Sequence, residues 1–282
     1  MTRTENGSVL LPAKFSPSSY ACLRSLSPRG VHTIVTSPHD VPAFASRYCD
    51  EAIIVPSAEE DLLAYKDALL SIAARPDVRT ILPIWVTDAY VLSKYRAEFE
   101  EHVTAMWSSM NTLREVHDRM RLVETAEKLG IPVPETWLLN EVPDWNRELI
   151  VKSRYNILAE DYVDSLAPGE CVVNKAVTYP EPGEEPDIET IRTKKEHTPI
   201  VQKVIPDVPG VEYAFRALYD HGELVTMGQK RQARGETYAG GASVYRESID
   251  DPRLEELGRT LLDSLEWHGL ASVQVFERRR YR

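Results

Sequence analysis

The sequence predicts a two-part α/β protein, in which a parallel sheet covered by helices is followed by an α+β part. Three observations lead to this expectation. The chain has 282 residues, which is enough for about two domains. Strand and helix patterns alternate through roughly the first hundred residues, as is typical of a parallel sheet. Further along, the apolar runs 211–219 and 223–228 flank the turn Asp220-His221-Gly222, which predicts an antiparallel hairpin.

Apolar runs and helix-start signals define the elements of the first part. Strands are expected at Val9–Leu11, Val31–Thr36, Ala52–Val55 and Thr80–Ile84, and helices at Ser18–Leu26, from a Ser57–Glu60 capping box to Ala74, and at Asp88–His102. Continuous apolar strands fit a sheet that is covered on both faces. The turn after the first strand lacks the G-x-G-x-x-G of a dinucleotide site. Residues 1–111 are therefore predicted to form a Rossmann-like domain that supports the rest of the chain.

The second part begins with a helix and continues mainly as strands. Apolar residues recur at helical spacing from Val116 to Leu129, and Gly130 and Pro132 then end the helix. Strands are expected at Leu149–Lys152, Ile200–Pro206 and Leu270–Phe276, the hairpin at Val211–Gly228, and a helix with one leucine stripe at Asp251–Gly269. The boundary between the two parts is placed near residue 112.

Composition excludes several classes of partner. The formal net charge of −11 opposes binding to nucleic acid, which needs clustered Lys and Arg. No apolar run reaches the ~18–20 residues of a membrane helix, and the first residues lack a secretory signal. The scattered Cys22, Cys49 and Cys171 favour reduced thiols over a disulfide framework. A cytoplasmic protein without nucleic-acid or membrane partners is expected.

Two cations stand at places where a phosphate group could be bound. Lys152 ends an apolar strand, so its ammonium group can face a ligand at the mouth of a sheet, although a solvated lysine would also account for it. Arg119 lies on the first turn of the helix that precedes Gly130, where ordinary solvation is again an alternative. The case for a phosphate-binding role of both cations rests on the order of these segments along the chain.

That order resembles the ATP-grasp superfamily. Asp118-Arg119 before Gly130-Ile131-Pro132-Val133-Pro134, followed by the strand ending at Lys152, is similar to the nucleotide-holding segments of the family. Arg119, where most members have Lys, resembles the carbamoyl-phosphate-synthase branch. The resemblance implies an ATP-grasp domain over residues 112–282, with a lid subdomain at about 133–200 and a C-terminal subdomain at 201–282. It also implies that Arg119 and Lys152 bind the α- and β-phosphates of ATP.

The same resemblance assigns further ligand contacts. The backbone of Gln202, Lys203, Val204 and Ile205 would bind the adenine edge, and Glu212 would accept the ribose hydroxyls. A plain buried strand followed by an exposed glutamate is the alternative. Arg231 and Arg234, in a basic stretch with several glycines, would stabilise the transferring phosphoryl group. A mobile charged loop is equally compatible with that stretch.

The metal site that the resemblance implies is only partly represented. Gln274, in ASVQVF, would be one Mg²⁺ ligand, unless it simply faces outward. The family's following strand carries E-x-N-P-R, whereas the residues after Phe276 read ERRRYR and contain only Glu277 as an acid. The sequence therefore predicts an ATP-grasp domain that lacks its C-terminal strand or strands. The loop after Lys152 has no glycine before Gly169, so the side chain of Arg154 is expected to substitute for a glycine-rich phosphate loop.

The implied activity is that of an ATP-dependent carboxylate–amine ligase, which forms an acyl phosphate with ATP and Mg²⁺ and then transfers the acyl group to an amine. A catalytically inactive nucleotide-binding protein or fragment is the alternative, because the second metal motif is absent from the sequence. A metabolite-binding module built on the first domain is a further alternative. The sequence leaves open which acid and amine would be joined, and whether the protein is a homodimer.

Overall fold

The structure is a computed structural model, and it describes residues 6–13, 17–173, 177–184, 186–189, 191, 197–205, 212–237 and 240–276, with the side chains of 235–237 and 240–242 left out. The chain divides into two compact units. Unit 1 comprises Met1–Leu113 and Asn156–Asn174, and unit 2 comprises Arg114–Tyr155 and Lys175–Arg282. The break after Leu113 lies close to the expected boundary, whereas the sequence placed 156–174 in the lid. Within the described ranges, no helix has both the length and the apolar character needed to cross a bilayer.

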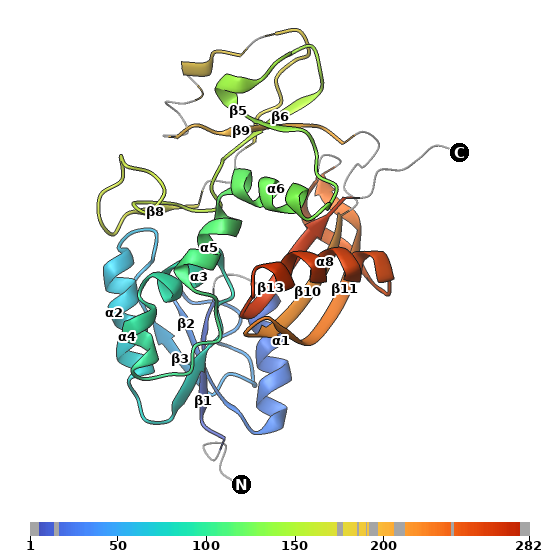
Figure 1. Ribbon diagram of the computed structural model, residues 1–282. Helices are drawn as coiled ribbons and strands as arrows, with labels where there is room; N and C mark the ends of the chain where they lie inside the picture. The colour runs from blue at the N-terminus through green and yellow to red at the C-terminus, as the bar shows by residue number, and fades with distance from the viewer. Residues whose placement is uncertain are drawn as a thin grey trace. The chain divides into compact units, whose positions relative to one another are not determined.

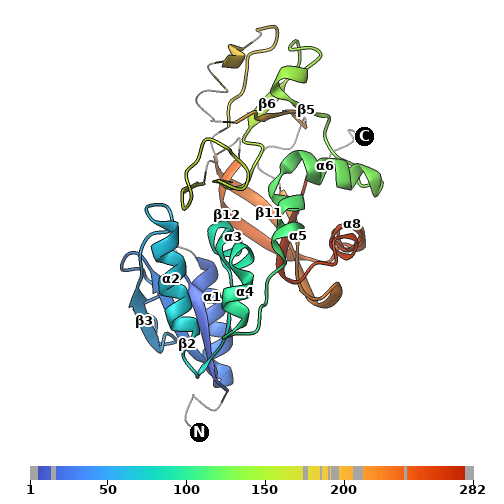
Figure 2. The same cartoon turned by 60° about the vertical axis from the view of Figure 1, so that its left-hand side comes forward.

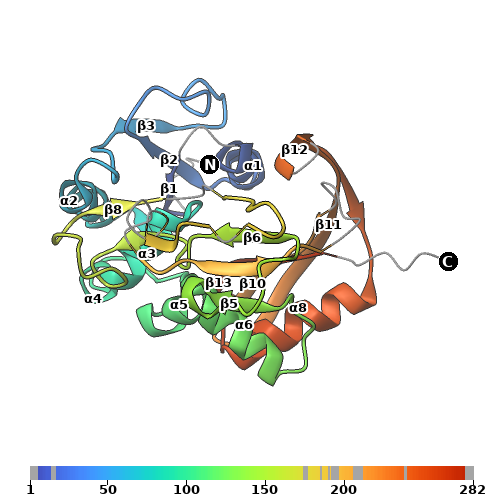
Figure 3. The same ribbon diagram turned by 90° about the horizontal axis from the view of Figure 1, so that it is seen from above.

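Unit 1 is built on a parallel four-stranded sheet. Its strands are β1 (Ser8–Pro12), β2 (His32–Ser37), β3 (Glu51–Ile54) and β4 (Val78–Ile81), in the order β3-β2-β1-β4. The helical segments are α1 (Pro17–Leu26), η1 (Ser27–Arg29), α2 (Leu62–Ala73), α3 (Val86–Lys94) and α4 (Arg96–Glu100). Since β2 and β4 flank β1 on opposite sides, right-handed crossovers place α1 and α2 on opposite faces, as Figures 1 and 3 show.

Two helices of unit 1 differ from the prediction. Helix α2 begins after Asp61, whose carboxylate accepts a hydrogen bond from the Ala64 N–H at 2.9 Å. Ser57 instead closes a turn, because its carbonyl oxygen accepts from the Asp61 N–H at 2.9 Å. The helix expected over 88–102 is divided at Tyr95 into α3 and α4. An aspartate that fits the N-cap better therefore takes precedence over the Ser57–Glu60 capping box.

The segment 156–174 completes unit 1. It contains the short strands β7 (Leu158–Ala159) and β8 (Cys171–Val172), which pair antiparallel. The Tyr90 hydroxyl donates to Asp161 Oδ2 at 2.6 Å, and Lys94 Nζ lies 2.7 Å from the same carboxylate oxygen. Leu158 is buried at 2 % exposure. These contacts attach the segment to α3, which is why it groups with the parallel sheet and not with the lid.

The first part of unit 2 holds a small antiparallel sheet. Helices α5 (Met110–His117) and α6 (Arg119–Lys128) are followed by β5 (Thr136–Leu138), η2 (Leu139–Glu141), β6 (Leu149–Lys152) and β9 (Ile200–Lys203). The strand order is β5-β9-β6, so β9 is central. Leu139, Leu149, Val151 and Val201 form its apolar core. The strands expected at Leu149–Lys152 and from Ile200 are thus neighbours.

The second sheet of unit 2 is larger and antiparallel. Its strands are β10 (Glu212–Asp220), β11 (Glu223–Thr237), β12 (Gly240–Ile249) and β13 (Gly269–Val275), in the order β12-β11-β10-β13. Helix α8 (Pro252–Ser264) covers one face, where Gly258 faces Phe215 and the Tyr219 hydroxyl donates to Asp263 at 2.7 Å (Figure 2). Strand β11 continues well beyond Gly228 to pair with β12, which the sequence did not predict.

Candidate functional site

The two faces of the β10–β13 sheet differ in character. One face carries Phe215 and Tyr219 and packs against α8. Side chains alternate along a strand, so the other face, here called the polar face, follows from the cross-strand register. Its members are Glu212, Ala214, Arg216, Lys230, Gln232, Arg246, Ser248, Ser272 and Gln274. Two of these, Glu212 and Gln274, are candidate site residues from the sequence.

Glu212 and Lys230 form an ion pair on the polar face. The Lys230 ammonium lies 3.1 Å from Glu212 Oε1, and the two side chains are only 14 % and 17 % exposed, respectively. The pair follows from the register, because Ala214 is the direct partner of Lys230 and Glu212 lies two residues away on the same face. The carboxylate proposed to accept the sugar hydroxyls is therefore held in place by a neighbouring cation.

Gln274 lies in the same cross-strand row as Lys230. Ala214 pairs with Lys230 on one side and with Gln274 on the other, so the three side chains share the polar face. The Gln274 side chain is exposed on this face. Glu277 lies outside the described residues. Glu212, the only carboxylate on the polar face as the structure describes it, is already paired with Lys230, so this donor set does not match the carboxylates that Mg²⁺ prefers.

Arg231 and Arg234 lie away from the polar face. Arg231 is the register partner of Tyr213 and of Glu247, and its guanidinium donates to Glu247 at 3.3 Å. A register shift follows Gln232, and Arg234 then pairs with Tyr245. Tyr245 and Glu247 are two residues apart on β12, so both arginines lie on the side of the sheet opposite Glu212. The prediction that they contact the transferring group gains no support from this arrangement.

A pair of cations forms the second half of the candidate site. Arg119 follows the N-cap of α6, and its guanidinium donates to the Ser153 carbonyl oxygen. Lys152 ends β6, and its ammonium group donates to Gln202 Oε1 at 2.9 Å. Burial lowers the pKa of both groups, and the charge of Arg119 lowers the pKa of Lys152 further. Within the described ranges, neither cation forms an ion pair with a carboxylate. Two adjacent, partly buried cations therefore carry surplus positive charge, which favours an anionic ligand.

Asp118, which precedes Arg119 in the sequence, contacts other groups. The Asp118 residue is 4 % exposed, and its carboxylate caps α6 by accepting a hydrogen bond from the Met120 N–H at 3.0 Å. The same carboxylate accepts three hydrogen bonds from the Arg154 guanidinium, at 2.7, 2.9 and 3.0 Å. Arg154 is thus engaged with Asp118, which opposes the expectation that its side chain replaces a glycine-rich phosphate loop. Asp118 neutralises Arg154 and leaves the charge of Arg119 available.

Two histidines that the sequence did not single out adjoin the cation pair. Burial and the charge of Arg119 lower the pKa of His117 to about 4, so this imidazole is neutral at pH 7. His197 Nε2 accepts a hydrogen bond from the Arg154 N–H at 3.0 Å and lies 3.1 Å from Ser153 Oγ. His197 thereby holds the turn that follows Lys152. It comes from an acidic, loop-rich stretch without a motif, so nothing in the sequence pointed to it.

The Gln202–Ile205 segment, predicted to bind adenine through its backbone, has some of its N–H groups already hydrogen-bonded within the protein. The Lys203 N–H donates to the Glu135 carbonyl at 3.0 Å, and the Val204 N–H donates to the Glu148 carbonyl at 2.9 Å. The side chain of Gln202 bridges Lys152 and Thr136. In the part of the chain that the structure describes, the Ile205 N–H has no hydrogen-bond partner. Of these four residues, Ile205 therefore offers the clearest backbone donor to a ligand.

Comparison with known proteins supports the fold assignment. No protein-family model matches the chain, and no curated protein sequence matches it. Among solved structures, a biotin carboxylase of Campylobacter jejuni in complex with beta-gamma-ATP is similar, with a TM-score of 0.63 at 15 % identity over 94 % of this chain and 61 % of its own. A carboxyaminoimidazole ribonucleotide synthase of Aspergillus clavatus, complexed with ATP, gives 0.63 at 15 % identity, covering 96 % and 66 %. An L-amino acid ligase of Bacillus licheniformis gives 0.55 at 14 %, covering 95 % and 62 %.

These similarities confirm the predicted fold class. The present chain spans 61 % of the length of the biotin carboxylase and 66 % of the length of the ribonucleotide synthase. At 14–15 % identity the likeness concerns the fold, and a mixed α/β architecture with one parallel and several antiparallel sheets is what the two units display. The chain has the ATP-grasp fold.

Proposed function

We propose that this protein binds ATP and acts as an ATP-dependent ligase that joins a carboxylic acid to an amine. One observation carries the proposal: Arg119 and Lys152 lie together, partly buried, without a carboxylate partner among the described residues. Holding two like charges in this way costs free energy unless an anion neutralises them. A polyphosphate chain is such an anion, and the ATP-grasp fold supports this choice.

The proposed contacts follow the two halves of the site. Arg119 and Lys152 bind the α- and β-phosphates, and the Gln202–Ile205 segment binds adenine, with the Ile205 N–H as a donor. Glu212, held by Lys230, accepts hydrogen bonds from the ribose hydroxyls. Each contact uses a group whose position is fixed by a strand end, a helix start or an ion pair.

The proposed reaction has two displacements. A carboxylate oxygen of the acid attacks the γ-phosphorus of ATP, and the bond from that phosphorus to the bridging oxygen of ADP breaks, giving an acyl phosphate and ADP. The amine nitrogen then attacks the acyl carbon, inorganic phosphate leaves, and the nitrogen loses a proton. The protein contributes positioning and charge stabilisation, as in phosphoryl transfer generally. No step is assigned to Mg²⁺, because the described polar face offers it no uncommitted carboxylate.

Calorimetric titration with ATP tests the binding step. The wild-type protein should bind ATP, and Lys152→Met should weaken binding by about 10- to 100-fold, since a hydrogen bond to a charged group contributes about 1.5–3 kcal/mol. Lys128→Met, at the exposed end of α6, is the matched control and should bind as the wild type does. Equal affinity of the Lys152 and Lys128 variants would overturn the phosphate assignment.

A nucleotide-binding protein without ligase activity is the second candidate. The observation that favours it is the polar face itself, where Gln274 is neutral and Glu212 is paired with Lys230. This alternative expects ATP binding that depends weakly on Mg²⁺ and no ADP release with any pair of acid and amine. ADP release that requires both an acid and an amine would decide for the ligase.

A further inference from the structure

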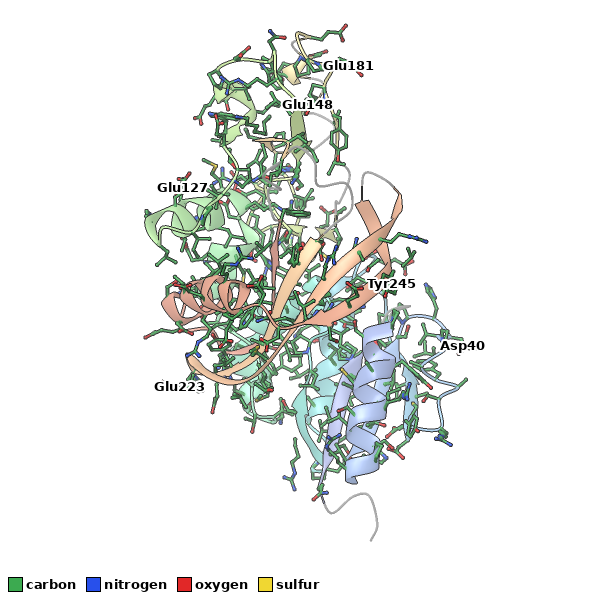
Figure 4. The ribbon with its side chains drawn as sticks, turned by 90° about the vertical axis from the view of Figure 1, so that its right-hand side faces the viewer. Asp40, Glu127, Glu148, Glu181, Glu223 and Tyr245 are labelled. Carbon is green, nitrogen blue, oxygen red and sulfur yellow. The ribbon has the colours of Figure 1, made fainter. Side chains whose placement is uncertain are left out.

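Two histidines stack on each other at one end of the larger sheet of unit 2. His221 lies in the turn between β10 and β11, and His268 lies between α8 and β13. Their ring centroids are 4.0 Å apart and the ring planes differ by 8°. The His268 residue is 6 % exposed, whereas the His221 side chain is 75 % exposed. Glu223, labelled in Figure 4, marks this end of the hairpin.

The two loops are tied together by backbone contacts. The Gly222 N–H donates to the Trp267 carbonyl at 2.8 Å, and the His221 N–H donates to His268 Nδ1 at 3.2 Å. His221 and Glu266 both have a φ of +46°, in the left-handed region that non-glycine residues seldom occupy. Such conformations are unfavourable for residues other than glycine and persist only where the surroundings hold them. The position of the His221 imidazole above His268 is thus built into the backbone of both loops.

Asp220 adds a carboxylate to the histidine pair. Its Oδ1 lies 3.6 Å from His268 Nδ1 and 3.9 Å from His221 Nε2. The ligand atoms of the three residues all lie within 4.8 Å of one another. Ligand atoms at about 2.1 Å from a tetrahedral Zn²⁺ are about 3.4 Å apart, so a contraction of at most about 1.4 Å would close this triangle around an ion.

Nδ1 of His268 faces both the proposed ligand Asp220 and the turn that holds His221. It lies 3.6 Å from Asp220 Oδ1 and accepts the His221 N–H at 3.2 Å. The lone pair of this nitrogen is engaged in that hydrogen bond, so an ion bound to Nδ1 would replace it. The two ring planes are nearly parallel, so one ring must turn for the in-plane lone pairs of both to meet the same ion. The exposed His221 and Asp220 side chains, at 75 % and 65 %, have room to do so.

We propose that Asp220, His221 and His268 bind a divalent transition-metal ion of the Zn²⁺ type, with water completing the coordination. Two imidazoles and one carboxylate are the ligand types that such ions select, whereas Mg²⁺ prefers oxygen ligands alone. The cluster is remote from the proposed nucleotide site. Strand β10 has 9 residues, with Glu212 and Asp220 at its two ends, so these residues are separated by about 26 Å at about 3.3 Å per residue.

Bound metal would link the hairpin turn to the loop before β13. The Gly222–Trp267 hydrogen bond already joins the two loops, and a coordinated ion would add a link that unfolding must break. The expected role is structural, since the cluster lies at the opposite end of β10 from the residues assigned to the nucleotide. Metal binding and ATP binding can therefore be measured independently of each other.

The test uses the full chain without an affinity tag, stripped of metal by a chelator. Calorimetric titration with ZnCl₂ in the absence of nucleotide should show one saturable site, Co²⁺ should give a visible d–d absorption band, and the thermal midpoint should rise with Zn²⁺ concentration. His221→Ala and Asp220→Asn should each weaken Zn²⁺ binding by at least about tenfold. His102→Ala, an exposed histidine of unit 1, is the matched control and should bind as the wild type does.

Two outcomes would overturn the site. One is wild-type protein that shows no saturable Zn²⁺ binding. The other is a His221→Ala variant that binds Zn²⁺ as tightly as His102→Ala does. The His221→Ala and His102→Ala variants replace exposed side chains and should remain folded. Titration of each variant with ATP checks independently that it is folded. His268→Ala is unsuited to the test because that side chain is buried.

Discussion

Asp118 pairs closely with Arg154, at 2.7 Å between Oδ2 and Nη2, and more distantly with Arg121, at 3.8 Å, and among the described residues it forms no ion pair with its sequence neighbour Arg119. The same carboxylate accepts the Met120 N–H at the start of α6. Because Asp118 serves Arg154 and the helix cap, the charge of Arg119 stays uncompensated beside Lys152. The surplus positive charge that we propose to bind phosphate therefore depends on which arginine pairs with Asp118.

The Asp118–Arg154 contact should be measurable as a coupling energy. Asp118→Asn keeps a good N-cap residue but removes the charge, so the free energy of unfolding should fall by about 1–3 kcal/mol. Urea denaturation of the two single variants and of Asp118→Asn/Arg154→Met should give a coupling of about 1–2 kcal/mol. Additive single effects would show that the two residues act independently.

Lys152 should titrate below the ordinary range of a lysine. Burial, followed by the charge of Arg119, lowers the pKa of this ammonium group. Nuclear magnetic resonance of ¹³C-methylated lysines can follow the titration, with Lys128 as the exposed reference. Arg119→Met should raise the pKa of Lys152, and saturating ATP should raise it as well, because phosphate favours the charged form. A Lys152 pKa that is insensitive to both changes would contradict the proximity of these cations.

His117 should make the protein sensitive to mild acid. Its pKa falls from 6.5 to about 4 on folding, so between these values the unfolded chain binds more protons than the folded one. Stability from this group is therefore complete above pH 6.5 and is lost as the pH falls toward 4. The expected loss is about 2 kcal/mol between pH 7 and pH 5. Urea denaturation of His117→Gln should show a shallower pH dependence in this interval than the wild type, and an equal slope would exclude His117 as the source.

Gly258 of α8 should not tolerate a side chain. A Cβ atom at this position would lie 2.3 Å from Cδ1 and 2.4 Å from Cγ of Phe215, which is fully buried. Gly258→Ala should lower the free energy of unfolding by about 1–3 kcal/mol through overpacking, although alanine is the better helix former. Combining it with Phe215→Leu should recover part of the loss in thermal denaturation. A Gly258→Ala variant more stable than the wild type would mean that α8 sits farther from β10.

Local signals predicted the elements on which Arg119 and Lys152 lie. Arg119 and Lys152 stand beside a helix cap and at a strand end, and both positions follow from residues within a few places along the chain. Glu212 and Gln274 were also placed on the expected strands. Their shared face required the β10–β13 register, which is a property of pairing over 60 residues or so and not of either segment.

Arg231 and Arg234 show why the other half was harder to predict. Side chains alternate with a period of two, so the face of each residue depends on knowing that β11 continues to Thr237 and where its register shifts. That continuation is set by β12, which carries no strong strand signal. The partnership of Tyr90 with Asp161 was equally hidden, because the two residues are 71 positions apart and neither belongs to a motif.

The interrupted make-up of unit 1 has a consequence for the order of events during synthesis on the ribosome. When Leu113 has emerged, the four parallel strands are complete, but Asp161 and the strand Leu158–Ala159 that attach to α3 have not yet been made. By the time they emerge, α6, β5 and β6 of unit 2 are already outside and await β9. The nascent chain must therefore hold β5 and β6 without their partner β9 while it finishes the unit that began first. A shortened protein that is to contain all of unit 1 has to extend to Asn174.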